Sequence, residues 1–187
     1  MHYLQAIEAY KPQTAQEEAD RSLILQMIET FGESILTRDC RAFHMTGSGF
    51  IFNAKHSHCL MIYHNLYQSW SYTGGHADGD PDLMTVAVRE AEEETGITGL
   101  IPLSEGIVSL DILPVFGHVK KGFYVSSHLH FSAVYAFTAD DTLPLQIKPD
   151  ENSRVGWIPV DRLEAYCTEA HMLPVYEKVI RQFKIKA

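Results

Sequence analysis

The chain has 187 residues, with 24 acidic and 15 basic side chains and a formal net charge of −9, and its length suits one domain with an extension. Its hydrophobic content of 45% and charged content of 21% argue against a disordered chain, a collagen or a coiled coil. Duplex binding depends on basic side chains that neutralise phosphates, so the excess of acidic side chains argues against a nucleic-acid partner. It does not exclude a phosphate substrate that arrives with metal ions.

The cysteines and the N-terminus indicate the compartment. Cys40, Cys59 and Cys167 are far apart and form no C-x-x-C pair. An odd and scattered set of cysteines is typical of a protein in a reducing environment. The N-terminus lacks the basic head and apolar stretch of a signal peptide. No apolar run approaches the ~18 residues that cross a bilayer. We therefore expect a soluble, cytoplasmic protein with no membrane partner.

The first predicted element is a helix that starts after Thr14. Thr14 and Glu17 have capping-box spacing. Apolar side chains then recur on one helical face before Gly32, a natural stop: Leu23, Met27, Ile28 and Phe31. We assign residues 1–40 to an N-terminal helical extension. It either lies on the main core or forms a dimer contact, so a homodimer is left open.

Short apolar or alternating runs next predict strands at residues 50–52, 59–63 and 69–73, the last of which ends at a Gly-Gly pair. A polar loop leads to Asp80 and Pro81, which suit the N-cap and first position of a helix. This helix is expected to run to about Thr95, before Gly96.

Further strands are predicted at residues 106–110, 124–138 and 155–158, and an amphipathic helix follows Pro174. The pattern indicates a mixed α/β or α+β domain. Two histidines, His128 and His130, alternate in a predicted strand, so both face one side. They would form a substrate pocket, a transition-metal pair or a half-buried polar face, and we favour the pocket.

The predicted helix after Pro81 places three carboxylates on its core-facing side. At about 100° per residue, Glu90 and Glu94 fall in the middle of the side that the apolar residues mark, Glu93 falls at its edge and Glu92 points away. A solvated charged face is the ordinary interpretation of such a run. Uncompensated charge is costly on a buried side, however, and Mg²⁺ or Mn²⁺ would compensate it because both prefer carboxylate oxygens. Arg89, one turn from Glu93, is expected to orient that carboxylate.

These residues resemble the signature of the Nudix hydrolase family. Gly75 matches its first glycine, and its second half is matched at the family's spacing by Arg89, Glu90, Glu93, Glu94, Gly96 and Ile97. There are two departures. Ala91 stands at a bulky aliphatic position, and Pro81 occupies the place of the first glutamate, with Asp80 beside it.

The resemblance extends to the segments at residues 44–49, 70–76 and 151–157, so residues 41–187 are identified as a Nudix domain. The family implies an α/β/α sandwich on a mixed β-sheet, to which the N-terminal helix is an addition. It also implies hydrolysis of a phosphoanhydride bond in a nucleoside diphosphate linked to another moiety.

Site roles follow from the resemblance by position. Mg²⁺ or Mn²⁺ would be held by Glu90, Glu93, Glu94 and the Gly74 carbonyl, with Arg89 orienting a glutamate. Glu151 on a late loop is our candidate for the general base, and Glu93 or Glu90 is the alternative.

Substrate contacts are predicted for five residues: Trp70, Tyr72, His76, His128 and His130. The two aromatic residues would stack on a base or belong to the core. Lys120 and Lys121 would contact phosphate or cap a loop.

Two other functions compete with hydrolysis. One is a non-catalytic module that senses a nucleotide or nucleotide sugar, which the proline at position 81 keeps open. The other is an isoprenoid diphosphate isomerase. That chemistry uses a cysteine, whereas Cys59 sits within an apolar run.

Overall fold

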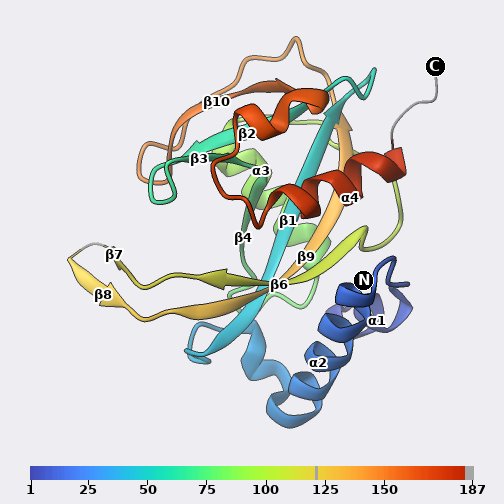
Figure 1. The fold of residues 1–187 in the computed structure, drawn as a ribbon, viewed down its shortest axis with the longest axis vertical. Helices are drawn as coiled ribbons and strands as arrows, with labels where there is room; N and C mark the ends of the chain where they lie inside the picture. The colour runs from blue at the N-terminus through green and yellow to red at the C-terminus, as the bar shows by residue number, and fades with distance from the viewer. Residues whose placement is uncertain (121, 184–187) are drawn as a thin grey trace.

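A mixed sheet forms the centre of the computed structural model, which describes residues 1–120 and 122–183 (Figure 1). Lys121, one of the two lysines predicted to contact phosphate, lies outside this description. The sheet's main path is β10–β2–β1–β9–β5, with β3 beside β2, β4 beside β1 and β6 beside β9. Its strands are β1 (Phe43–Asn53), β2 (His58–His64), β3 (Ser69–Ser71), β4 (Thr73–His76), β5 (Ile101–Pro102), β6 (Ser109–Val115), β9 (His128–Ala139) and β10 (Asn152–Pro159).

Helices and one separate hairpin complete the fold. The hairpin of β7 (His118–Lys120) and β8 (Phe123–Val125) projects from the molecule in Figure 1. The helices are α1 (Tyr3–Ala9), α2 (Ala15–Phe31), α3 (Leu83–Thr95) and α4 (Leu173–Phe183), with 3₁₀ turns at Gly32–Leu36 and Val160–Ala165. No helix in the described part of the chain is long and apolar enough to cross a membrane.

The long strand β1 determines where the glycine pair lies. β1 runs parallel to β9 over its whole length, from Phe43 opposite Leu129 onwards. Its other edge takes two antiparallel partners in succession, β4 along the first half and β2 along the second. As a result, Gly74 lies opposite Ser48 in the interior of the sheet.

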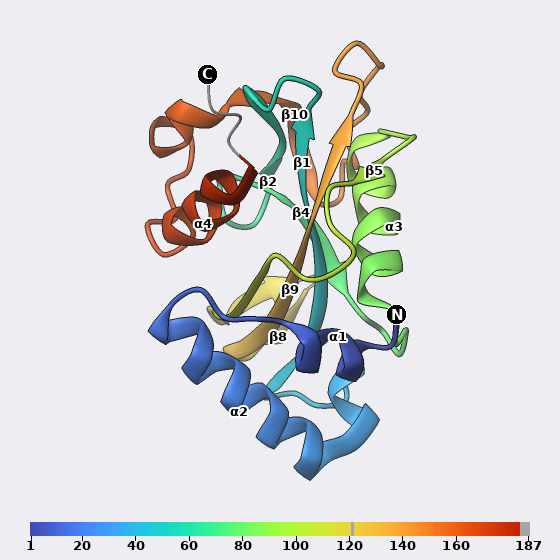
Figure 2. The same cartoon turned by 90° about the vertical axis from the view of Figure 1, so that its right-hand side faces the viewer.

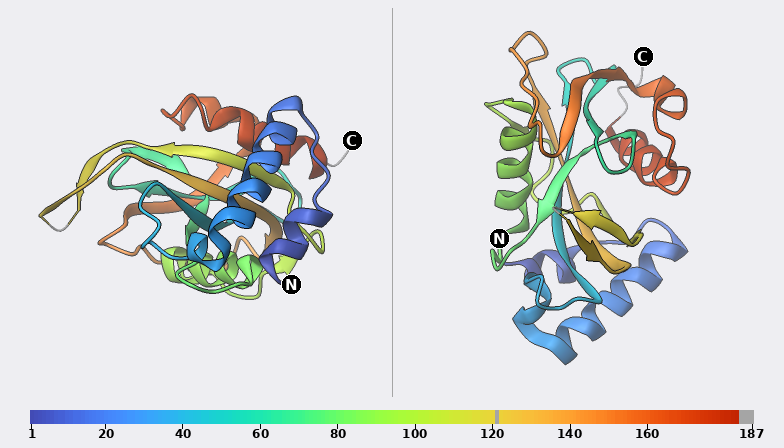
Figure 3. Two further views of the ribbon diagram at one scale, coloured as in Figure 1. Left: turned by 90° about the horizontal axis from the view of Figure 1, so that it is seen from below. Right: turned by 90° about the vertical axis from the view of Figure 1, so that its left-hand side faces the viewer.

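The sheet is covered by α3 on one face and by α4 on the other (Figure 2; Figure 3, right). Gly47 on β1 permits the close approach of α3, because a Cβ there would lie 3.0 Å from the Cβ of Val86. On the other face, Tyr176 of α4 packs in a buried cluster with Phe50 and Phe52. The predicted α/β/α sandwich on a mixed sheet is confirmed.

Two helices, α1 and α2, lie at one end of the sandwich where the sequence predicted one (Figure 2; Figure 3, left). The start of α2 is confirmed, because the Thr14 side chain accepts a hydrogen bond from the Glu17 amide at 3.1 Å. The short α1 has no side-chain cap at its N-terminus, so it carries no such signal. Both helices share a hydrophobic cluster with the sheet through Ile7 and Ile24, and the division at residue 40 stays a prediction.

The predicted apolar face of α2 is wrong in part. Leu23 and Phe31 are 42% and 45% exposed, whereas Ile24 and Ile28 are buried. The helix is therefore rotated relative to the expected face. The cause is Glu17, whose carboxylate turns inward to make buried polar contacts.

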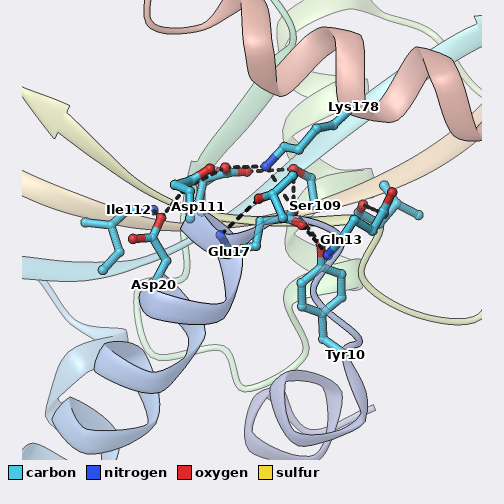
Figure 4. A network of polar contacts seen from close by, with 12 residues as sticks. Tyr10, Gln13, Glu17, Asp20, Ser109, Asp111, Ile112 and Lys178 are labelled. Atoms are coloured by element: carbon cyan, nitrogen blue, oxygen red, sulfur yellow. Dashed lines mark hydrogen bonds and ion pairs between the residues drawn. The ribbon is translucent and has the colours of Figure 1, made fainter.

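A buried ionic network fixes this rotation (Figure 4). The Nζ atom of Lys178 on α4 lies 2.8 Å from Glu17 Oε1 and 2.5 Å from Asp111 Oδ1 on β6. The Tyr10 hydroxyl also donates to Glu17, and the Ser109 hydroxyl donates to Asp111. The network joins the N-terminal helices, the sheet and the last helix, and no pattern in the sequence predicted it.

Three predicted boundaries shift. The helix α3 is capped by Asp82, whose side chain accepts from the Met84 and Thr85 amides, and not by Asp80. The end of α3 at Thr95 is confirmed, with the next glycine in the left-handed conformation. The strand predicted at 106–110 spans Ser109–Val115, and the one predicted at 124–138 is divided between β8 and β9.

Candidate active site

Glu94, near the end of α3, is the most deeply buried of the acidic side chains on this helix. It is only 3% exposed and accepts a hydrogen bond from the Gly74 amide at 3.0 Å. Burial raises the pKa of Glu94 to about 8, and the nearby carboxylates Glu151 and Glu90 add to the rise. The helix thus presents a buried acid to the glycine pair.

One turn earlier, Glu90 lies against Gly75. A Cβ added to Gly75 would lie 2.5 Å from Glu90 Oε2, so any residue other than glycine would displace this carboxylate. Burial and the neighbouring Glu93 raise the pKa of Glu90. The i,i+4 spacing therefore places Glu90 and Glu94 beside the two successive glycines.

Glu93 is on the exposed edge of this site, as the helical wheel predicted. Its Oε2 atom lies 3.0 Å from Lys148 Nζ, which also lies 3.0 Å from Glu151 Oε2. One lysine thus joins the acidic helix to the late loop. The structure brings Glu151, the candidate general base, to the same cluster as the three helix glutamates.

Arg89 makes different contacts from those expected. It lies 3.4 Å from Asp80 and 3.6 Å from Glu90, and the expectation that it orients Glu93 is wrong. Glu93 instead pairs with Lys148, because the late loop approaches that edge of α3. Asp80, next to the departure at Pro81, supplies the carboxylate that holds Arg89 beside Glu90.

Trp70 and Tyr72, the two aromatic residues predicted to contact substrate, pack with the core on the face of the sheet opposite α3. Trp70 is half-buried, with its ring edge-on to Tyr63 and Tyr166. Tyr72 is edge-on to Tyr176 of α4 and its hydroxyl lies 3.2 Å from Ser132 Oγ. These contacts favour the core alternative, and a substrate role for either residue stays a prediction.

The three predicted histidines do come together. His76, His128 and His130 cluster on the face of the sheet away from α3, and a fourth histidine, His44, lies among them. Because His44 stands in β1, far along the sequence from the others, only strand pairing reveals it.

Comparison with known proteins identifies the family. The family model described as the NUDIX domain matches residues 43–183, most of the chain. The chain belongs to the Nudix family.

Relatives and solved structures agree with this assignment. This Nudix hydrolase is 27% identical over 123 residues to the RNA pyrophosphohydrolase of Pelagibacter ubique (strain HTCC1062), covering 64% of this chain and 77% of that protein. It is similar in fold to the MutT protein from Methanosarcina mazei Go1, with a TM-score of 0.57, 18% identity and coverage of 78% and 99% of the two chains. A NUDIX-family hydrolase from Clostridium perfringens has a TM-score of 0.53 and 20% identity, with 75% and 98% covered.

Two residues of the candidate site were not singled out from the sequence. Lys148 bridges Glu93 and Glu151. Asn152 is fully buried, and its Nδ2 atom donates to the Glu94 carbonyl at 2.9 Å, which ties the late loop to α3. The only sequence signal was the likeness of residues 151–157 to a loop and strand of the family.

The isomerase alternative is not supported by the position of the cysteine. Cys59 is 1% exposed within the cluster beneath α4, and burial raises the pKa of its thiol. All three cysteines are free thiols.

Proposed function

We propose that this Nudix hydrolase cleaves a phosphoanhydride bond in a nucleoside diphosphate linked to another moiety, with Mg²⁺ or Mn²⁺ as its cofactor. The observation that carries the proposal is the convergence of Glu90, Glu94 and Glu151 at the Gly74–Gly75 pair. Water attack on a phosphate needs the phosphate charge neutralised and a base close to the water.

The residues present fit a hard divalent cation. The cluster consists of carboxylate oxygens, the donors that Mg²⁺ and Mn²⁺ prefer. Glu94 is buried and, among the residues that the structure describes, forms no ion pair with a cationic side chain, a state that a bound cation would compensate. In this proposal Glu90, Glu93, Glu94 and the Gly74 carbonyl hold the ion. When bound, the ion neutralises phosphate charge and lowers the pKa of a water.

Glu151 is proposed as the general base. Its side chain is 29% exposed, so it is accessible to water and still close to the helix carboxylates. Lys148, 3.0 Å away, holds it beside Glu93, at the edge of the cluster where a base would meet the attacking water. Arg89 is proposed to position Glu90, which is 3.6 Å from it.

The test is a turnover screen of the full chain with and without Mg²⁺ or Mn²⁺. The panel contains ADP-ribose, a diadenosine polyphosphate, a nucleotide sugar, NADH, CoA and an oxidised nucleoside triphosphate. Metal-dependent product that is lost in Glu93→Gln and Glu94→Gln would support the proposal. Glu92→Gln is the matched control, because Glu92 lies on the same helix and faces solvent. Turnover that is unaffected by both site variants would contradict it.

The competing sensor function predicts a different result. Tight binding of one compound without product, in the presence of metal, would favour a nucleotide or nucleotide-sugar sensor. A 5′-triphosphorylated RNA belongs in the panel too, because the relative from Pelagibacter ubique is named an RNA pyrophosphohydrolase. The net charge of −9 leads us to expect small molecules as the better substrates. The cytoplasmic location and the homodimer stay predictions.

A further inference from the structure

Four histidines gather at one end of three adjacent strands. His44 on β1 is directly opposite His130 on β9, and His76 on β4 is opposite Thr46, two positions along β1 from His44. His128 is two positions before His130 on β9. Residues two apart on a strand share a face, so register alone brings all four imidazoles to the same side of the sheet.

The geometry of the cluster is close to that of a metal site. One ring nitrogen from each histidine lies within 4.8 Å of the corresponding nitrogens of the other three. Tetrahedral Zn²⁺ with bonds of about 2.0–2.1 Å separates its ligand nitrogens by roughly 3.4 Å. From a separation of 4.8 Å, each nitrogen would need to move by only about 1 Å, well within rotation of the side chain.

Hydrogen bonds orient two of the rings as ligands. His44 Nδ1 lies 3.2 Å from the Cys40 carbonyl, and His128 Nδ1 lies 2.9 Å from the Ser126 carbonyl. Because a carbonyl oxygen only accepts, each Nδ1 carries the proton and each Nε2 keeps its lone pair. Carbonyl partners of this kind commonly fix the tautomer of metal-binding histidines.

Two of the nitrogens are buried without any partner. Within the described residues, His44 Nε2 and His130 Nε2 are inaccessible and make no hydrogen bond. A buried polar atom without a partner is costly. An ion between the rings would satisfy both nitrogens.

Burial holds three of the imidazoles in the neutral form that binds metals. It lowers the pKa of His76 to about 3 and that of His130 to about 2, and it also lowers the pKa of His44. The charged groups that influence the cluster are Arg38, Asp78 and Lys120, and the first two are paired with each other at 2.6 Å. Because no carboxylate belongs to the set of four, Mg²⁺ is a poor match.

We propose that His44, His76, His128 and His130 form a binding site for a borderline divalent transition-metal ion of the Zn²⁺ class. Neutral imidazoles suit Zn²⁺, Co²⁺, Ni²⁺ and Cu²⁺. The site is separate from the glutamate cluster, because Gly75 faces Glu90 on α3 while the next residue, His76, faces the other side of the sheet. An ion here links three strands and steadies β4, which also carries Gly74 and Gly75.

The test uses the untagged full chain, stripped with a chelator and titrated with Zn²⁺ or Co²⁺. We expect the chain to bind one equivalent of metal ion, and this binding should require all four histidines. We also expect a tetrahedral Co²⁺ absorption band and a raised Tm with Zn²⁺. His44→Gln and His130→Gln should each lower the affinity by more than the ~10–100-fold cost of losing an outer ligand partner. His171→Gln, at an exposed histidine outside the cluster, should leave it unchanged.

Two further measurements distinguish ligation by the histidines from ligation by the glutamates. Glu90→Gln and Glu94→Gln should keep the Co²⁺ band. Loss of the band in either variant would show that the ion is bound by the glutamates and would overturn the proposal. X-ray absorption of the Zn²⁺-loaded unmutated chain should show nitrogen ligation from imidazole, a result that does not depend on any variant folding. Binding weaker than micromolar, or oxygen ligation, would also overturn it.

Discussion

Gly75 and Glu90 fit together so closely that a Cβ on the glycine would lie 2.5 Å from the Oε2 atom of the glutamate. We predict that Gly75→Ala lowers kcat by roughly 100-fold, because a shift of about 1 Å in a positioned group can cost that much. The far end of the Glu90 side chain can move aside, so Tm should change little. Steady-state kinetics and thermal unfolding measure the two effects. Gly106→Ala is the matched control, since a Cβ at Gly106 meets nothing within 4 Å.

Glu94 is expected to destabilise the metal-free protein at alkaline pH. Its folded pKa is raised from 4.5 to about 8, so the folded state prefers the neutral acid. The associated stability is present below pH 4.5 and is lost as the pH rises towards 8. Glu94→Gln should therefore raise the unfolding free energy at pH 8 by at least about 1 kcal/mol, since one pKa unit is about 1.4 kcal/mol.

This prediction is checked by denaturant unfolding in the presence of a chelator at acidic and alkaline pH. The gain from Glu94→Gln should shrink as the pH falls, while Glu92→Gln on the solvent side should show no such trend. An equal gain at both pH values would mean that burial of the Glu94 charge is not its cause.

Asp80 and Arg89 are expected to act as a unit that positions Glu90. Both side chains are partly exposed, at 30% and 39%, so the pair contributes only about 0.2–1 kcal/mol of stability. Asp80→Asn and Arg89→Gln should each lower kcat a few-fold, with KM less affected. In a double-mutant cycle the two losses should not add, because both act through the same carboxylate. Fully additive losses would show independent roles.

Lys178 is expected to be essential for stability. Its replacement by Met leaves Glu17 and Asp111 buried without their cation, and breaking a buried pair in this way costs about 3–5 kcal/mol. Arg181→Met removes an exposed cation from the same helix and should change stability by less than about 0.5 kcal/mol. Equilibrium unfolding compares the two variants, and similar stabilities would refute a structural role for the network.

The part of the site that lies on one helix could be predicted from the sequence. The i,i+3,i+4 spacing of Glu90, Glu93 and Glu94 follows from helical geometry alone. The apolar residues of the same helix show which side is buried, and the burial of Glu94 confirmed this. The end of α3 before Gly96 could also be predicted from neighbouring residues, because the left-handed conformation after the helix favours glycine.

The start of α3 shows where local reasoning failed. Asp80 and Asp82 are both competent caps in sequence, and Asp82 is the one that accepts from the first helical amides. Asp80 is taken by Arg89, a contact that exists only after the loop has folded against the helix. Competition between two similar residues is decided by their distant partners.

The sequence by itself determined the acidic face of α3 and the glycine pair before it, because helix periodicity and turn chemistry act over a few residues. The sandwich architecture was predicted from the resemblance to the Nudix family. Only the tertiary structure decided that Lys148 bridges Glu93 to Glu151, that Lys178 neutralises Glu17 and that His44 joins three other histidines. Each of these arrangements includes at least one contact between residues that are dozens of positions apart. They depend on strand register and on how helices dock, which are properties of the whole packed core.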